Sequence, residues 1–471
     1  MSRRAEVEVL TAAAAEDLQR RAAGALAEAG CRPGDRVAVC LPSSAALLCM
    51  VLGALRTGVV PVLLNATLTA PERQALVDDA RPRLAVTQPA QLAELLDGAP
   101  VELAPFPLSR PMHYTSGTTG RPKGVWAGLW DEATAAAAFG DEADIWSFGP
   151  EDVHLVCSPM YHSVSVRFAA GTLLRGGTCV ILSRFEAATA LEVLGGSRPA
   201  DDGGRPVPVP TTTFMAPAVL RRLLDLAGDR AGSALGRLRL LAHAGSPCPG
   251  SLKHAALAVT RTGALVEFYG STEGQFTVCP PDDWLAHPGT VGRARPGRLV
   301  AVDPDGTVWC RPPPHGGFQY WGDEAKTRAA WRDGYFTVGD LGRLDDEGFL
   351  FLDGRRDDLV ISGGVNVYPA EVESVLSEAP GVAEVAVLGV TDERWGERVC
   401  AALVPGPSAG RRLVEDVAGV AASRLAPYKR PKEYVVVDAL PRTATGKVQR
   451  HRHRALFGDV GGGGPDPEPA A

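Results

Sequence analysis

The first third of the chain alternates between helical and extended patterns of apolar residues. Apolar residues at helical spacing occupy residues 11–29, 43–56 and 69–80. Short apolar runs, each long enough for one buried strand, occupy residues 36–41, 59–64 and 84–87. Strands that alternate with helices of these lengths predict a parallel sheet covered by helices, and therefore an α/β fold.

The last quarter of the chain has a different pattern. Residues 382–388 and 399–404 are apolar runs typical of strands, and a helix is expected to begin at Pro369. Before them, residues 299–303 and 307–311 indicate a β-hairpin. We therefore expect a large α/β domain, a small α+β domain and, at residues 459–471, a disordered tail.

Composition narrows the class of protein. Of 471 residues, 45% are hydrophobic and 22% are charged, which is typical of globular domains. The net charge of −7 gives no basic signature for nucleic acid. The nine cysteines form no CxxC pair, so we expect neither a zinc site nor a disulfide framework, and a cytoplasmic setting fits best. The most apolar run, residues 45–64, is interrupted by Arg56, Gly58 and Pro61, so we expect no membrane span. Residues 2–4, Ser-Arg-Arg, are followed by Ala and Glu rather than by an apolar run, so we expect no signal peptide.

Residues 114–124 read YTSGTTGRPKG and are the strongest candidate for a ligand site. Glycines allow a tight turn close to a ligand, while backbone N–H groups and hydroxyls can donate to phosphate oxygens. Lys123 adds a mobile positive charge. The stretch is not a Walker A loop, because Lys123 follows Pro122 and precedes Gly124. A flexible surface turn is the alternative interpretation.

Four further strings follow in order, and together with the first they resemble the adenylate-forming superfamily of acyl-CoA and aryl-CoA ligases. Residues 267–274 read EFYGSTEG, residues 334–340 read GYFTVGD, residues 354–358 read GRRDD and residues 440–447 read LPRTATGK. The resemblance covers nearly the whole chain. It implies a large adenylation (AMP-binding) domain at residues 1–355 and a mobile lid domain at residues 356–458.

The resemblance also implies which residues bind the substrates. The expected ATP and AMP contacts are Thr115, Ser116, Gly117, Thr118, Thr119, Gly120, Gly245, Ser246, Pro247, Tyr269, Gly270, Thr272, Asp340 and Arg355. Tyr269 is expected to stack on adenine, Asp340 to accept from the ribose hydroxyls and Glu273 to bind Mg²⁺. Lys123, Lys447 and His162 are the expected catalytic side chains.

The acid and the thiol would approach from other segments. The expected acid pocket consists of His162, Phe214, Met215, Phe268 and Phe276, which indicates an apolar or aromatic acid of modest size. The coenzyme A channel would be formed by Ser362, Gly363 and Gly364, and the lid would rotate about Asp357. No aspartate stands in the two pocket strings to pair with an α-ammonium, which argues against an amino acid.

The resemblance therefore implies an ATP-dependent acid–CoA ligase that works through an acyl adenylate, as a monomer or a homodimer. Three alternatives stay open: a ligase that loads a carrier protein, an enzyme with another acid or nucleophile such as a diazotase, and a nucleotide-binding scaffold without catalysis. Two departures from the family pattern leave room for an altered reaction: Trp126 after the first string, for which core packing is the simpler explanation, and the short segment 88–113.

Overall fold

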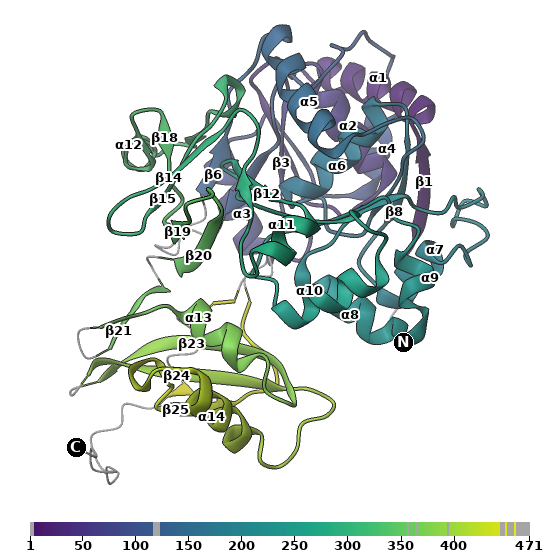
Figure 1. The fold of residues 1–471 in the computed structure, drawn as a ribbon. Helices are drawn as coiled ribbons and strands as arrows, with labels where there is room; N and C mark the ends of the chain where they lie inside the picture. Colours follow the sequence, from purple (N-terminus) through teal and green to yellow (C-terminus); the bar gives the residue numbers. More distant parts are fainter. Residues whose placement is uncertain are drawn as a thin grey trace, which may run out of the picture. The chain divides into compact units, whose positions relative to one another are not determined.

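The computed structural model describes residues 4–115, 123–355, 358–362, 365–392, 395–442, 448–449 and 456–457 (Figure 1). Contacts divide the chain into two compact units. The first comprises Met1–Val338 and Gly342–Leu352, and the second comprises Gly339–Leu341 and Asp353–Ala471. Helices and mixed sheets make up both units, so the predicted α/β class is confirmed.

The first unit contains two large sheets with parallel centres; antiparallel strands lie at one edge of the first sheet and at both edges of the second. The first sheet has the order β16 (Gln319–Tyr320), β6 (Lys123–Trp126), β5 (Met112–Thr115), β3 (Val60–Leu63), β2 (Arg36–Val39) and β4 (Leu84–Val86). The second has the order β1 (Val7–Thr11), β8 (Thr178–Leu182), β7 (Val153–Val156), β9 (Thr212–Phe214), β10 (Leu240–His243), β11 (Leu265–Gly270), β12 (Gln275–Cys279) and β13 (Arg293–Ala294). In both sheets the central strands are parallel, so their carboxyl ends meet at one edge.

A layer of helices is buried between the two sheets. It consists of α1 (Ala12–Glu28), α2 (Ala45–Leu55) and α6 (Ser163–Leu174). Thr11 caps α1 by accepting from the Ala14 N–H, and Ser44 caps α2 by accepting from the Leu47 N–H. Both sheets contribute side chains to the core around these helices, for example Val39 from β2 and Ile181 from β8.

Further helices cover the outer faces of the sheets. The first sheet packs against α3 (Ala70–Ala80), and the second against α7 (Ala187–Leu194), α8 (Pro217–Ala227), α9 (Ala231–Leu235) and α10 (Gly250–Val259). The remaining helices of this unit are α4 (Pro89–Leu95), α5 (Glu132–Trp146), α11 (Pro281–Ala286) and α12 (Glu324–Ala330). The remaining strands are β14 (Leu299–Val302), β15 (Val308–Arg311), β17 (Trp331–Arg332), β18 (Tyr335–Phe336), β19 (Asp340–Leu344) and β20 (Leu350–Arg355).

The second unit is a small sheet packed on two helices. Its strands are β21 (Val360–Ser362), β22 (Val365–Val367), β23 (Val382–Asp392), β24 (Gly396–Pro405) and β25 (Glu433–Val436), and its helices are α13 (Pro369–Leu376) and α14 (Leu413–Arg424). Pro369 occupies the first turn of α13, where its missing N–H costs no hydrogen bond. The predicted α+β character is therefore present. None of the described helices is long and apolar enough to cross a membrane.

The apolar pattern predicted most elements within residues 4–95 but missed two. Strand β1 pairs antiparallel with β8, more than 160 residues away in sequence, so local pattern could not reveal it. Helix α4 lies within the segment that we had treated as a short connection. Trp126 is half-buried and packs against Trp321, with ring centroids 5.4 Å apart, which agrees with a packing role.

The close contact between α1 and α2 generates a prediction about stability. A Cβ at Gly53 in α2 would lie 2.3 Å from the Gln19 carbonyl oxygen in α1. Gly53→Ala should therefore force the helices apart and lower the free energy of unfolding by about 1–3 kcal/mol. Gly140→Ala in α5 is the matched control, since nothing lies within 4 Å of its Cβ, and it should stabilise by up to about 1 kcal/mol. Equal denaturant midpoints for the two variants would contradict the packing argument.

Candidate active site

The predicted adenine site lies where two neighbouring parallel strands end. Strands β10 and β11 pair with His243 opposite Glu267. Gly245 and Tyr269 each come two residues later, so the register brings the two segments side by side. Gly245 has a φ of +93° and open space around its Cβ position, so this turn leaves room for a ligand. Ligands of parallel α/β sheets bind at such carboxyl ends.

A buried ionic contact ties these two strands together. The Lys253 Nζ lies 2.7 Å from His243 Nε2 and 2.7 Å from Glu267 Oε2. All three side chains are buried. Burial raises the pKa of Glu267 and lowers that of His243 well below its usual value. No local pattern in the sequence indicates this contact. It links β10 and β11, the strands that lead to Gly245 and Tyr269.

The structure brings Lys123 and Glu273 into contact with the same tyrosine, Tyr320. Thr115 at the end of β5 lies opposite Lys123 at the start of β6. The Lys123 Nζ lies 4.8 Å from the centroid of the Tyr320 ring, and the Tyr320 hydroxyl donates to Glu273 Oε1 at 3.0 Å. The role of Tyr320 could not be predicted from the sequence, because Tyr320 and Glu273 are 47 residues apart and no local pattern relates them.

These residues fit a magnesium site of the phosphate-bridging type. Among the described residues, no group of three or more His, Cys, Asp or Glu side chains is placed to hold a metal ion. Glu273 is a buried carboxylate with one oxygen bound by Tyr320. Mg²⁺ in nucleotide sites often takes one or two carboxylates, with substrate phosphates and water completing its shell. The donor set is therefore compatible with Mg²⁺ that binds together with ATP.

The expected acid-pocket residues differ in their surroundings. Phe214, Met215, Phe268 and Phe276 are all buried among core side chains, and none of them lines either of two cavities in the described part of the chain, one beside residues 319–324 and one beside residues 271–275. His162 precedes the first residue of α6, and its ring lies 4.6 Å from that of Tyr161. Their contact with an acid stays a prediction.

A cavity of about 140 Å³ lies beside the EFYGSTEG loop instead. Its wall includes Ser271, Thr272 and Gly274, which flank Glu273, and Ser163, which follows His162. Arg110 and His113 line it from the segment that leads into the YTSGTTG string. Burial lowers the pKa of His113 to about 4, so this imidazole is neutral at physiological pH.

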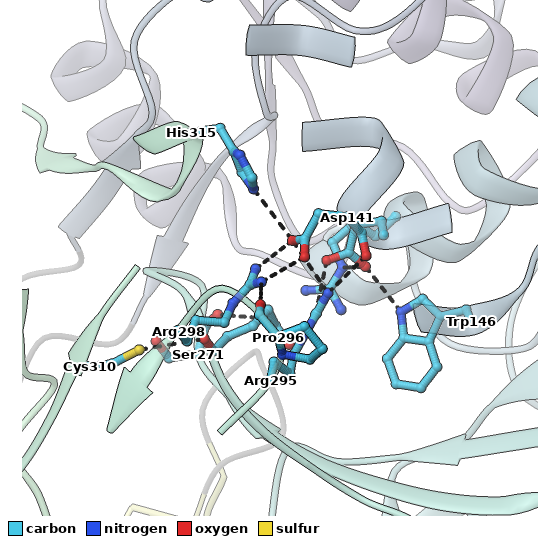
Figure 2. Close-up of polar contacts among 11 residues, drawn as sticks. Asp141, Trp146, Ser271, Arg295, Pro296, Arg298, Cys310 and His315 are labelled. Carbon is cyan, nitrogen blue, oxygen red and sulfur yellow. Dashed lines mark hydrogen bonds and ion pairs between the residues drawn. The ribbon is translucent and has the colours of Figure 1, made fainter. Parts of the chain in front are cut away.

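Two acidic side chains of α5 and several arginines form an ionic cluster beside this cavity (Figure 2). Asp141 accepts from both terminal nitrogens of Arg298, at 2.7 and 2.5 Å, and lies 3.4 Å from Arg295 and from His315. Although burial opposes ionisation, His315 and the two arginines hold the pKa of Asp141 below its usual value of 3.8. The wall of the cavity is therefore charged.

The other predicted site residues belong to the second unit or lie outside the described residues. Asp340 begins β19 and is buried, and Ser362 ends β21 and is also buried. Arg355 ends β20. The positions outside the described residues are Ser116, Gly117, Thr118, Thr119, Gly120, Asp357, Gly363, Gly364 and Lys447. The roles of all these residues stay predictions.

Comparison with known proteins agrees with the motif order. The family model described as AMP-binding enzyme matches residues 3–105 and 111–316, and the model of the AMP-binding enzyme C-terminal domain matches residues 371–447. The indoleacetate–CoA ligase of Aromatoleum aromaticum is 33% identical, with 93% of this chain and 91% of the relative covered. The long-chain-fatty-acid–CoA ligase FadD13 of Mycobacterium tuberculosis is 31% identical, with the same coverage of both chains.

A solved structure supports the same assignment. The ATP-bound structure of MatB from Rhodopseudomonas palustris is 29% identical, covers 95% of this chain and 93% of its own, and superposes with a TM-score of 0.79. The similarity thus extends over the large domain and the C-terminal domain. The chain belongs to the AMP-binding enzymes of the adenylate-forming superfamily.

Proposed function

We propose that the protein is an AMP-forming acid–CoA ligase that activates a carboxylic acid as its acyl adenylate. The observation that carries this proposal is the convergence of Lys123 and Glu273 on Tyr320 in an AMP-binding enzyme, with the neighbours of Glu273 lining a cavity. The names of the two CoA-ligase relatives support the reaction class.

In the first half-reaction the carboxylate of the acid attacks the α-phosphate of ATP and pyrophosphate leaves. The phosphates would be bound by Thr272 and by the YTSGTTG string, which includes Thr115. Tyr269 would stack on adenine. Mg²⁺ held by Glu273 would offset negative charge on the phosphates. Lys123 would stabilise the leaving pyrophosphate, and Lys447 would hold the acid carboxylate against the α-phosphate.

In the second half-reaction a thiol attacks the acyl adenylate and AMP leaves. We propose that the lid turns about Asp357, withdraws Lys447 and brings the loop of Ser362, Gly363 and Gly364 to the adenylate. No protein nucleophile is needed. Coenzyme A is the proposed acceptor of the acyl group. We further propose that the protein acts in the cytoplasm, as a monomer or a homodimer.

The direct test is pyrophosphate release over a panel of carboxylic acids, followed by addition of coenzyme A or a carrier protein. Acid-dependent pyrophosphate release and a thioester formed with coenzyme A would support the proposal. Release without a thioester of coenzyme A would point to the carrier protein or another nucleophile. ATP binding without release for any acid would contradict a ligase.

Glu273→Gln should mainly lower the rate of adenylation. The amide can still accept from Tyr320, so local packing is kept, but it carries no charge to offset Mg²⁺. We expect the Mg²⁺ concentration needed for half-maximal pyrophosphate release to rise roughly tenfold or more. Tyr320→Phe is the matched control, since it removes the hydroxyl and keeps the carboxylate. Wild-type Mg²⁺ dependence in Glu273→Gln would place the metal elsewhere.

Lys447→Ala should separate the two half-reactions. If Lys447 supplies both positioning and charge, adenylate formation should fall by about 10² or more. Conversion of a chemically prepared acyl adenylate to the thioester should continue, because the lid has turned away by then. A lysine in an exposed basic tail would instead be neutral to remove.

Asp357→Pro provides the complementary variant. A proline fixes φ and should restrict rotation of the lid, so the second half-reaction should be lost while the first is kept. Single-turnover measurements of both steps in both variants decide between the models. Equal loss of both steps in Lys447→Ala would mean general damage to the lid domain.

A further inference from the structure

The ionic cluster beside the cavity carries more positive than negative charge. Three guanidinium groups, those of Arg110, Arg167 and Arg298, line the cavity, and Arg295 packs against the same carboxylates. Asp141 and Glu142 are the acidic residues in the wall. Four arginines therefore face two carboxylates.

The two carboxylates are already taken by three of the arginines. Asp141 is bound by Arg298 and Arg295, as described above. Glu142 accepts from Arg295 Nη1 at 3.1 Å and from the Trp146 indole at 3.1 Å, and it lies 3.2 Å from Arg167 Nε. Both acidic groups therefore stay ionised: although burial opposes it, the neighbouring arginines lower the pKa of Glu142.

Arg110 has no carboxylate within salt-bridge distance among the described residues. Its Nη2 donates a hydrogen bond to the Gly317 carbonyl oxygen at 3.1 Å. Burial and the repulsion of Arg167 lower its pKa to about 10, so it still carries its charge at neutral pH. Glu273 also acts on Arg110 electrostatically, but this carboxylate accepts from Tyr320 and is assigned to Mg²⁺.

Buried donors around the cavity also lack partners among the described residues. Arg167 Nη2, Arg298 Nε and the Ser271 hydroxyl are buried, and none of them forms a hydrogen bond with a described residue. Leaving such groups unsatisfied is costly, so they call for an occupant with acceptor atoms. Water could accept these bonds, but only an anion would also compensate the excess charge.

The position of the cavity indicates that this anion is part of the acid substrate. Thr272 and Gly274 flank Glu273, where the phosphates are expected, and Ser163 adjoins His162. The cavity volume of about 140 Å³ is close to that of an engineered cavity that holds benzene, so it admits a group of about six non-hydrogen atoms. A small acid, or the far end of a larger one, would fill it.

We propose that this cavity is part of the acid-binding site and that the acid carries a second anionic group, a carboxylate, which Arg110 and Arg167 bind. The inference rests on the proposed ligase function and names its substrate class. It departs from the wholly apolar acid that Phe214, Met215, Phe268 and Phe276 had suggested, because these side chains pack in cores.

The test uses pairs of acids in which a carboxylate replaces a methyl group: butanoate and succinate, hexanoate and adipate, and 4-methylphenylacetate and 4-carboxyphenylacetate. ATP–pyrophosphate exchange gives kcat/KM for each acid. In the wild type, the diacid of at least one pair should be preferred by roughly tenfold or more, because a charge-assisted hydrogen bond is lost with the methyl analogue.

Three variants then test whether Arg110 is responsible for the diacid preference: Arg110→Gln, Arg110→Lys and Arg21→Gln. Arg110→Gln keeps a donor for the Gly317 carbonyl but removes the charge, so kcat/KM should fall roughly tenfold more for the diacid than for its monoacid partner. Arg110→Lys should retain part of the preference. Arg21→Gln on α1 is the matched control, since Arg21 lies outside the cavity wall and forms its ion pair with Asp17 of the same helix, and the diacid preference should not change.

The outcomes separate this inference from the proposed function. If only the monoacids are activated and converted to thioesters, the ligase function is supported, but the proposal that the acid carries a second anionic group is wrong. An unchanged diacid preference in a folded Arg110→Gln would overturn the role of Arg110. If that variant does not fold, an unchanged diacid preference in Arg110→Lys decides in the same way. No exchange with any acid of the wider panel would overturn both.

Discussion

The arrangement of the first unit depends on one helix that is apolar on every side. Nine consecutive residues of α2, Leu47–Leu55, are buried. A helix with no polar face must be covered all round, so it can only lie inside the molecule. The two sheets and the helices α1 and α6 supply this cover. The α1–α2 contact at Gly53 is one place where the cover is so close that no side chain fits.

This buried layer determines where a ligand can bind. With helices packed on both faces of the sheets, the faces are unavailable, and the carboxyl ends of the parallel strands are the open places. Strands β10 and β11 end there beside each other, held by the buried contact of Lys253 with Glu267 and His243. Such a contact is costly to form and costlier to break, so it acts as a rigid support for the adenine site that we propose.

Charge divides the site into two regions with different chemistry. On one side, Lys123, Tyr320 and Glu273 are placed for phosphate and metal. On the other, arginines from the loop before β5, from α6 and from the turn after β13 surround a small cavity. A family fold supports many acids because these wall residues can change without disturbing the sheets. The identity of the acid is thus a property of the wall rather than of the fold.

The sequence by itself determined the fold class, most elements within residues 12–86 and the family. Helical and strand periods are local, and they predicted α1, α2, α3 and the strands between them. The strings at residues 114–124 and 267–274 depend on backbone and side-chain chemistry within a few residues, so they could be read directly. The prediction of an α/β domain followed by an α+β domain was confirmed for the same reason.

Only the tertiary structure decided which distant residues meet. Strand β1 joins β8, Tyr320 reaches Glu273, and Arg298 reaches Asp141 across 157 positions of sequence. Phe214 and Phe268 were predicted from their place in the sequence to contact the acid, and this stays a prediction; the structure shows that they pack among core side chains and that arginines line the cavity beside residues 271–274. Apolar character shows that a side chain avoids water, but whether it faces a core or a ligand depends on contacts between remote segments, which local patterns do not encode.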